Sequence, residues 1–151
     1  VGSEMCIRDS PTTIMTNSAE NNGNIFGAVD YLNHKKDIIN TGVTIKEYEG
    51  GISYHGKSMT IDDDIAIVGS FNMDMRSAYI DTELMLVINS KYINKQLKAS
   101  MEEYEKKAAT VKNETEYSHI PEEMKMKELS DKKKNIKAWF GWAMNGLRFL
   151  F

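Results

Sequence analysis

The sequence contains one cysteine, Cys6, among its 151 residues. A single thiol cannot form a disulfide within the chain, so cysteine pairing gives no information about the compartment in which the protein works. The sequence also lacks an uninterrupted apolar run of about 18 residues, and we therefore predict no membrane-spanning helix in this stretch.

A strong excess of either charge sign is also missing. The 19 Lys and Arg residues against 22 Asp and Glu residues give a formal net charge of -3. Dedicated nucleic-acid binders usually carry a basic field, so the composition argues against nucleic acid as a partner. The composition is still compatible with a phosphate-binding site, because a few local cations suffice to bind a phosphate group. The proportions of hydrophobic (41%) and charged (27%) residues are typical of one globular domain.

The first ten residues show neither helical nor strand periodicity, and the chain opens on Val1. We expect residues 1–10 to be a non-native or truncated leader outside the folded domain. Cys6 lies in this leader and has no expected functional role.

Strand and helix patterns alternate from residue 11 to residue 110. Residues 25–39 and 93–108 show helical spacing, and Gly42 follows the first helix as a C′ residue. The uniformly apolar stretch at 84–88 predicts a strand covered on both faces. The chain therefore predicts an α/β half-domain with a mixed β-sheet flanked by helices. The expected strands lie at residues 12–16, 43–48, 54–61, 65–70 and 84–88.

The C-terminal part has a different character. Residues 111–130 are mainly polar and predict a linker, whereas residues 131–151 combine lysines with aromatic and apolar side chains. Such a composition suits an amphipathic tail on an anionic membrane surface, through residues 132–151. Docking on the core or on a missing domain, or disorder, remains as an alternative.

The segment that begins at His55 contains the residues that point most clearly to a chemical function. On a strand, His55 and Lys57 would face the same side. Ser70 and Asn72 have the same two-residue spacing at the end of the next strand. The turn at Asp62–Asp64 would allow the two strands to pair. An imidazole, an ammonium, a hydroxyl and an amide would then meet, which is a set suited to stabilising a phosphoryl group.

A carboxylate on Nδ1 of the imidazole would fix its tautomer and leave Nε2 for chemistry. Glu83 opens the strand that follows the loop, where it can face the same cleft. It is therefore the best candidate for orienting His55.

The pattern His55-x-Lys57-x4-Asp62, followed by Gly69-Ser70-x-Asn72 and by Glu83, resembles the HKD motif of the phospholipase D superfamily. The resemblance covers residues 12–105, about two thirds of the chain. The runs Thr16-Asn17-Ser18, Ser70-Phe71-Asn72-Met73-Asp74-x-Arg76-Ser77 and Thr82-Glu83 are similar to the second half of bacterial cardiolipin synthases.

The resemblance implies that two motifs face each other and that one histidine forms a phosphohistidine. His55 would then be the general acid and base, with the nucleophile as its alternative role. Lys57 and Asn72 would bind the phosphate, and Glu83 would orient His55. No cofactor or metal is implied. The supporting residues would be Gly69, Ser70 and, as a structural turn residue, Asp62.

The implied function is phosphatidyl transfer in the manner of cardiolipin synthase, by the second-motif half of a larger enzyme. Its partners would be a phospholipid such as phosphatidylglycerol and the missing N-terminal motif half, at the bacterial cytoplasmic membrane. A homodimeric single-motif phosphodiesterase or nuclease, and a half that is inactive by itself, remain as alternatives. The lipid, the acceptor and the oligomeric state are left open.

Overall fold

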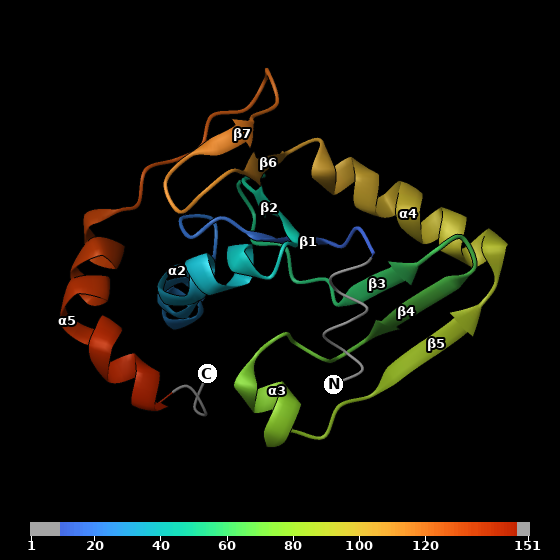
Figure 1. The fold of residues 1–151 in the computed structure, drawn as a ribbon, viewed down its shortest axis with the longest axis horizontal. Coiled ribbons are helices and arrows are strands. Elements are labelled where there is room, and N and C mark those ends of the chain that lie inside the picture. Colours follow the sequence, from blue (N-terminus) through green and yellow to red (C-terminus); the bar gives the residue numbers. More distant parts are fainter. Residues whose placement is uncertain (1–9, 148–151) are drawn as a thin grey trace.

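The computed structural model describes residues 10–147, so most of the expected leader and residues 148–151 lie outside the described part. Figure 1 shows the described elements, two β-sheets with helices around them. In chain order these are β1 (Thr13–Asn17), α2 (Ile25–Asn40), β2 (Thr44–Tyr48), β3 (Ser58–Ile61), β4 (Ile65–Gly69), α3 (Met75–Tyr79), β5 (Met85–Asn89), α4 (Lys91–Glu105), β6 (Ala108–Val111), β7 (Tyr117–His119) and α5 (Asp131–Leu147).

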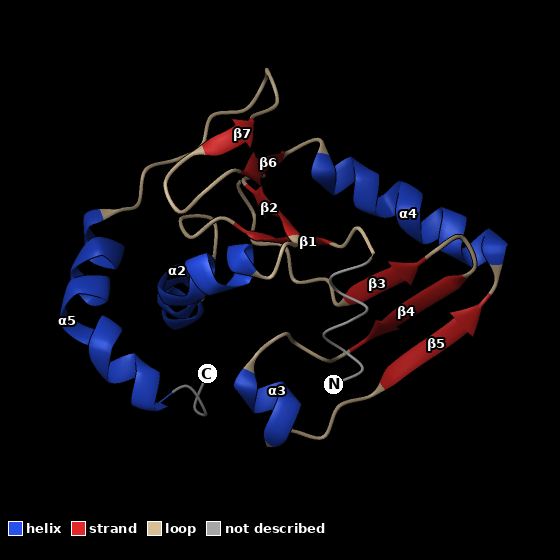
Figure 2. Cartoon of the chain, viewed as in Figure 1, coloured by secondary structure: helices blue, strands red, loops and turns tan. Residues whose placement is uncertain are grey.

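The strands form a four-stranded sheet of order β1-β2-β6-β7 and a three-stranded sheet of order β3-β4-β5 (Figure 2). β1 and β2 are parallel and are joined through α2, whereas all other neighbours are antiparallel. The helix α4 contacts both sheets. This architecture confirms the predicted α/β class with a mixed sheet flanked by helices.

Local sequence signals account for the ends of α2. The Asn24 side chain accepts hydrogen bonds from the backbone N–H groups of Phe26 and Gly27 and so caps the helix start. After the helix, Gly42 has a φ of 86°, in the left-handed region that glycine tolerates best. The predicted role of Gly42 as the residue that ends this helix is thereby confirmed.

A buried charge cluster joins α2, β2 and β7. The Glu47 carboxylate lies 2.8 Å from Lys35 Nζ, and both side chains are almost fully buried. The hydroxyls of Tyr31 and Tyr117 donate to the same carboxylate at 2.6 and 2.5 Å. Burial, together with the Glu47 charge, raises the pKa of both tyrosines, so they stay protonated and act as donors. Four side chains from three elements therefore satisfy one another's charges and hydrogen-bonding groups.

The second half of the fold differs from the prediction at two places. α4 ends at Glu105, and Ala108 and Ala109 are buried in β6 instead of in a longer helix. The expected linker at 111–130 contains β7, which pairs with β6. Short strands of mixed polarity carry weak periodic signals, and it is their pairing in the folded chain that defines them.

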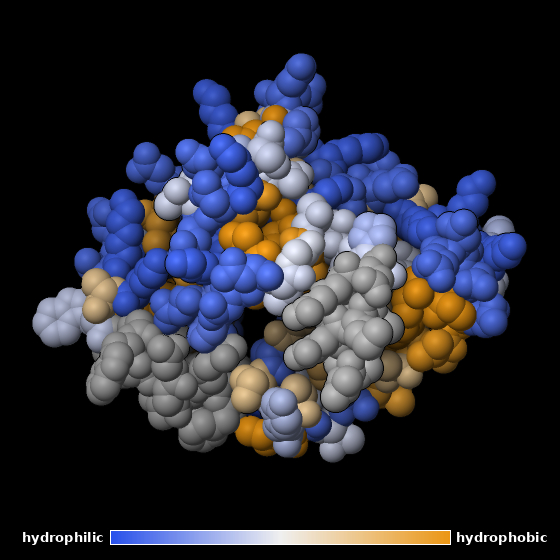
Figure 3. Space-filling model, in the orientation of Figure 1, coloured by the Kyte–Doolittle hydropathy of each residue, from blue (hydrophilic) through white to orange (hydrophobic). Residues whose placement is uncertain are grey.

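The apolar strand β5 is less covered than expected. Leu86 and Val87 are adjacent and so point to opposite faces, yet they are 58% and 61% exposed. β5 is an edge strand whose only described partner is β4. Figure 3 shows hydrophobic residues gathered over the β4–β5 end of the molecule and again near α3. The prediction of a strand covered on both faces is wrong for the described residues.

No helix within residues 10–147 has both the length and the apolar character needed to cross a bilayer.

The Glu47 cluster makes a test of the fold. Replacing Lys35 by Met leaves a buried carboxylate without its cation, and we expect the free energy of unfolding to fall by about 3–5 kcal/mol. The matched change Lys112→Met removes an exposed pair with Glu116 and should reduce it by less than about 1 kcal/mol. Urea unfolding of both variants measures the difference, and equal losses would contradict a structural role for the buried pair.

Candidate functional site

His55 and Lys57 lie in the segment between β2 and β3. The sequence predicted a strand here, but β3 begins only at Ser58. The two side chains nevertheless meet, because Lys57 Nζ lies 2.9 Å from Nε2 and 3.3 Å from Nδ1 of His55. Which ring nitrogen takes part in this contact depends on the tautomer of the imidazole. The His55 side chain is exposed and open to a ligand.

The antiparallel β3–β4 pair brings the end of β4 beside this segment. Ser58 is paired with Val68, and the Gly69 N–H donates to the Lys57 carbonyl at 3.1 Å. A Cβ at Gly69 would lie 2.2 Å from the Leu84 carbonyl oxygen. Glycine is therefore required for β4 and the segment before β5 to approach this closely. The predicted pairing of these two strands through the Asp62–Asp64 turn is confirmed.

Glu83 lies on the other side of Gly69, against two serines. The Ser70 hydroxyl donates to the Glu83 carboxylate and accepts from the Leu84 N–H at 3.0 Å. The hydrogen bonds from Ser70 and then from Ser77, with a smaller contribution from the Lys57 charge, lower the pKa of Glu83 below its ordinary value of 4.5. A carboxylate that stays ionised therefore faces the Lys57 side of the site.

Asn72 begins a turn that leads into the short helix α3. Its backbone N–H donates to the Ser77 hydroxyl at 3.2 Å, and the Ser77 N–H donates to Asp74 at 2.7 Å. Asp74 thereby caps α3. Ser77, only 6% exposed, links the Asn72 backbone to the Glu83 carboxylate. The sequence placed Ser77 in the run that resembles cardiolipin synthases, but it assigned Ser77 no role in the site.

Asp62 lies in the tight turn between β3 and β4, with a φ of 48°. Its carbonyl accepts from Lys98 of α4, which also pairs with Asp63 at 2.8 Å. Asp tolerates the left-handed region better than most residues. Asp62 thus occupies the turn that the sequence predicted for it.

The structure brings together two pairs, His55 with Lys57 and Ser70 with Glu83. In the described part of the chain no hydrogen bond joins Glu83 to the imidazole. Only one histidine lies here, because His34 is on α2 and His119 is on β7. The site therefore offers one imidazole, one ammonium and one ionised carboxylate on an open surface.

The fold is that of a phospholipase D-like domain. The chain superposes on phosphatidylserine synthase from Haemophilus influenzae Rd KW20 with a TM-score of 0.65, at 14% identity, over 97% of this chain and 37% of that one. Residues 6–104 match the family described as cardiolipin synthase, PLD-like domain, and the chain belongs to this family.

Among curated relatives, cardiolipin synthase A of Wigglesworthia glossinidia brevipalpis is 35% identical over 68 residues, which is 45% of this chain and 14% of that protein. Cardiolipin synthase A of Yersinia pseudotuberculosis serotype O:1b (strain IP 31758) is 33% identical over 78 residues, 52% of this chain and 16% of that protein. The matched part of the chain thus spans about a sixth or less of these relatives.

The serine contacts predict how Glu83 titrates. In the double variant Ser70→Ala, Ser77→Ala the carboxylate loses both donors, so the pKa of Glu83 should rise toward 4.5. A carboxyl whose pKa is lowered by folding stabilises the protein above its unfolded pKa, and this stability is lost as pH falls through the folded value. The wild type should therefore lose more stability on acidification below 4.5 than the double variant. Unfolding measured against pH tests this, with Ser118→Ala as a control remote from the site.

Proposed function

We propose that this chain is the second-motif half of an enzyme that transfers a phosphatidyl group between phospholipids in the manner of cardiolipin synthase. The observation that carries the proposal is the contact between Lys57 and His55, near an ionised Glu83 whose pKa the Lys57 charge helps to lower. A cation beside an imidazole suits a phosphodiester, whose transition state spreads negative charge over its oxygens.

In the proposed reaction, the histidine of the other motif attacks phosphorus and forms a nitrogen–phosphorus bond. The phosphorus–oxygen bond to the leaving alcohol breaks, and that oxygen takes its proton from His55. An acceptor alcohol then gives its proton to His55 while its oxygen attacks phosphorus and displaces the histidine. The reverse assignment makes His55 the nucleophile.

Lys57 and Asn72 are proposed to hold the phosphate oxygens. The ammonium would move from the imidazole to the substrate, which frees the ring nitrogen for proton transfer. Ser70 and Ser77 would keep Glu83 charged and in place. In this arrangement the negative charge of Glu83 would stabilise the Lys57 ammonium. Glu83 would contact the imidazole only after the site closes around a substrate.

The site needs a second imidazole, and the exposed apolar side chains indicate where its carrier would dock. Tyr79, Ile80, Leu84, Leu86 and Val87 are each more than half exposed and lie on α3, on β5 or between them. Apolar surface of this kind commonly marks an interface. We therefore propose that the other motif half covers this edge of the molecule, around α3 and β5, either from the same polypeptide or from a second copy.

Mutation of His55 tests the activity. In the full-length protein, His55→Asn should lower the formation of cardiolipin from phosphatidylglycerol vesicles by about 10²- to 10⁴-fold, because proton transfer is lost. The matched changes His34→Asn and His119→Asn should leave turnover unchanged, since both residues lie on other elements. Thin-layer or mass-spectrometric lipid analysis measures the product.

Other products would redirect the proposal. Cleavage of DNA or of water-soluble diesters by an unmutated dimer, with phospholipid untouched, would replace phosphatidyl transfer by the homodimeric phosphodiesterase. Full lipid turnover by His55→Asn would remove His55 from the reaction.

The helix α5 is proposed to bind an anionic membrane surface. Lys132, Lys134 and Lys137 are exposed, and Trp139 is 84% exposed. Lysines attract anionic headgroups, and tryptophan favours the interface. The remainder of the proposed membrane segment, residues 148–151, lies outside the described part of the chain.

The triple variant Lys132→Ala, Lys134→Ala, Lys137→Ala should bind phosphatidylglycerol vesicles about 10²-fold more weakly, from about 1 kcal/mol per lysine. The control variant Lys91→Ala, Lys95→Ala, Lys106→Ala removes equal charge from α4 and its C-cap residue. Vesicle sedimentation measures the difference, and equal weakening would argue for net charge instead of a located surface.

A further inference from the structure

The backbone that carries His55 has no strand or helix of its own. β2 ends at Tyr48 and β3 begins at Ser58. Beyond these strands the backbone hydrogen bonds lie at the two ends of the segment, from the Glu49 N–H to the Lys107 carbonyl and from the Gly69 N–H to the Lys57 carbonyl. The middle of the segment, next to His55, must be held by side chains.

One side chain of β1 supplies this restraint. Asn17 Oδ1 accepts from the Tyr54 N–H at 2.7 Å, and Asn17 Nδ2 donates to the Tyr54 carbonyl at 2.7 Å. A carboxamide therefore pairs with both polar groups of residue 54, as a neighbouring strand would. Tyr54 directly precedes His55, so this pairing fixes the chain one residue before the imidazole.

We propose that Asn17 is a positioning residue of the reaction, which sets the location of the His55 imidazole by holding the Tyr54 backbone. This inference rests on the proposed function of His55. Asn17 touches neither the imidazole nor Lys57, and it acts only through the backbone. A misplacement of about 1 Å at a catalytic group can lower the rate about 10²-fold, so a restraint at this position affects turnover.

The ring of Tyr54 is held from its other side. Its centroid lies 4.6 Å from that of Tyr104 on α4 and 6.1 Å from that of Tyr48 on β2. Aromatic pairs at these distances attract each other. With the ring packed and both backbone groups bonded, residue 54 has little freedom to rotate, and the direction in which the chain enters His55 is defined.

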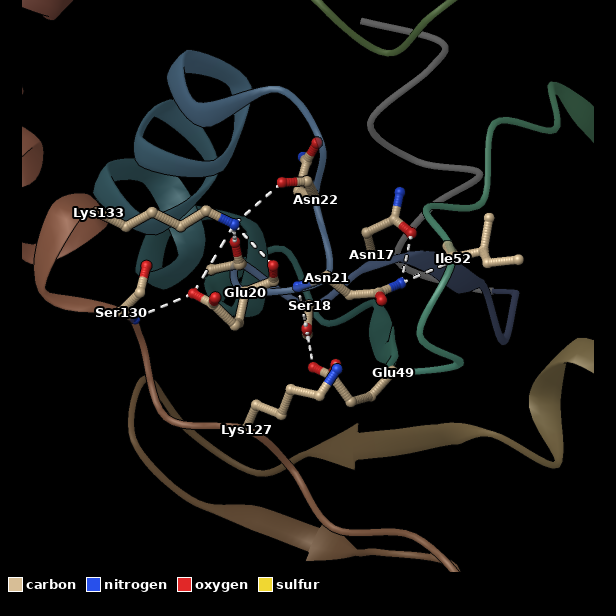
Figure 4. A network of polar contacts seen from close by, with 11 residues as sticks. Asn17, Ser18, Glu20, Asn21, Asn22, Glu49, Ile52, Lys127, Ser130 and Lys133 are labelled. Atoms are coloured by element: carbon tan, nitrogen blue, oxygen red, sulfur yellow. Dashed lines mark hydrogen bonds and ion pairs between the residues drawn. The ribbon is translucent and has the colours of Figure 1, made fainter.

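Asn17 is itself supported by the loop that follows β1. Asn21 Nδ2 donates to Asn17 Oδ1 at 3.2 Å and to the Ile52 carbonyl at 3.3 Å. The Ser18 hydroxyl donates to the buried carboxylate of Glu49, and it accepts from the Asn21 N–H at 3.0 Å. Figure 4 shows these side chains pointing toward the segment that contains Ile52 and Glu49. The loop thus contacts the His55 segment at several points.

The C-terminal segment holds the far side of the same loop. Lys133 is 7% exposed and donates to the carbonyls of Ala19, Glu20 and Asn22 at 2.8, 2.6 and 3.0 Å. The Ser130 N–H donates to Glu20 at 2.9 Å (Figure 4). The hydrogen bond from Ser130, and then the charge of Lys133, lower the pKa of Glu20. The loop that supports Asn17 is therefore fixed between α5 and the His55 segment.

The experiment compares Asn17→Asp with Asn22→Asp in the full-length protein. Both add one negative charge, Asn17→Asp at the end of β1 and Asn22→Asp in the loop that follows it. Asp at 17 keeps the acceptor for the Tyr54 N–H but sets a carboxylate oxygen against the Tyr54 carbonyl. The Asn22 side chain instead accepts from the Asn24 N–H, which Asp can also do. We expect Asn17→Asp to lower kcat for phosphatidyl transfer about 10²-fold with KM unchanged, and Asn22→Asp to change neither.

A second readout does not need turnover. Deuterium exchange at Cε1 of the His55 ring, followed by mass spectrometry, reports the surroundings of this imidazole. It should change in Asn17→Asp and stay as in the wild type in Asn22→Asp. Unaltered kcat and unaltered exchange in Asn17→Asp would overturn the inference. A lower kcat that comes only with a lower melting temperature, while exchange at His55 is unaltered, would overturn it as well.

The two proposals can fail separately. If the wild-type protein turns over no phospholipid, the proposed function fails, and exchange at His55 alone decides whether Asn17 positions the imidazole. If the wild type is active and Asn17→Asp is equally active, the positioning role fails while the proposed function stands.

Discussion

The buried carboxylate of Glu47 is the constraint on which the rest of the fold depends. A carboxylate out of contact with water must be neutralised and fully hydrogen-bonded. Lys35 of α2 and the hydroxyls of Tyr31 and Tyr117 meet that demand together. The requirement holds α2 against β2 and brings the Tyr117 side chain of β7 to Glu47. The segment that follows β2 carries His55, so the strand with the core cluster leads into the site.

The site itself is held by single side chains more than by regular structure. Asn17 substitutes for a strand beside Tyr54, and Ser70 and Ser77 together keep Glu83 charged. Such an arrangement leaves His55 exposed and Lys57 half-buried, on a surface that a second motif and a lipid headgroup could both reach. The apolar side chains on and before β5 lie at the same end of the molecule. An open site next to an uncovered strand is what half of a two-motif enzyme would present.

The C-terminal helix combines two kinds of lysine on one element. Lys133 points inward and is bonded to three carbonyls of the loop after β1, whereas Lys132 and Lys134 are exposed. The inner lysine attaches the helix to the loop that supports Asn17, and the outer lysines face solvent, where anionic headgroups could reach them. A surface-binding helix attached in this way would lie within one loop of the catalytic segment.

The spacing of His55, Lys57, Ser70, Asn72 and Glu83 led to the proposed site, and strand alternation predicted the β3–β4 pair, because both depend on local order along the chain. Only the tertiary structure decided that residues 54–57 are not a strand and that β5 is open. Long-range contacts such as Asn17 with Tyr54 join residues that are 37 positions apart in the sequence. Local sequence patterns do not indicate contacts across that separation.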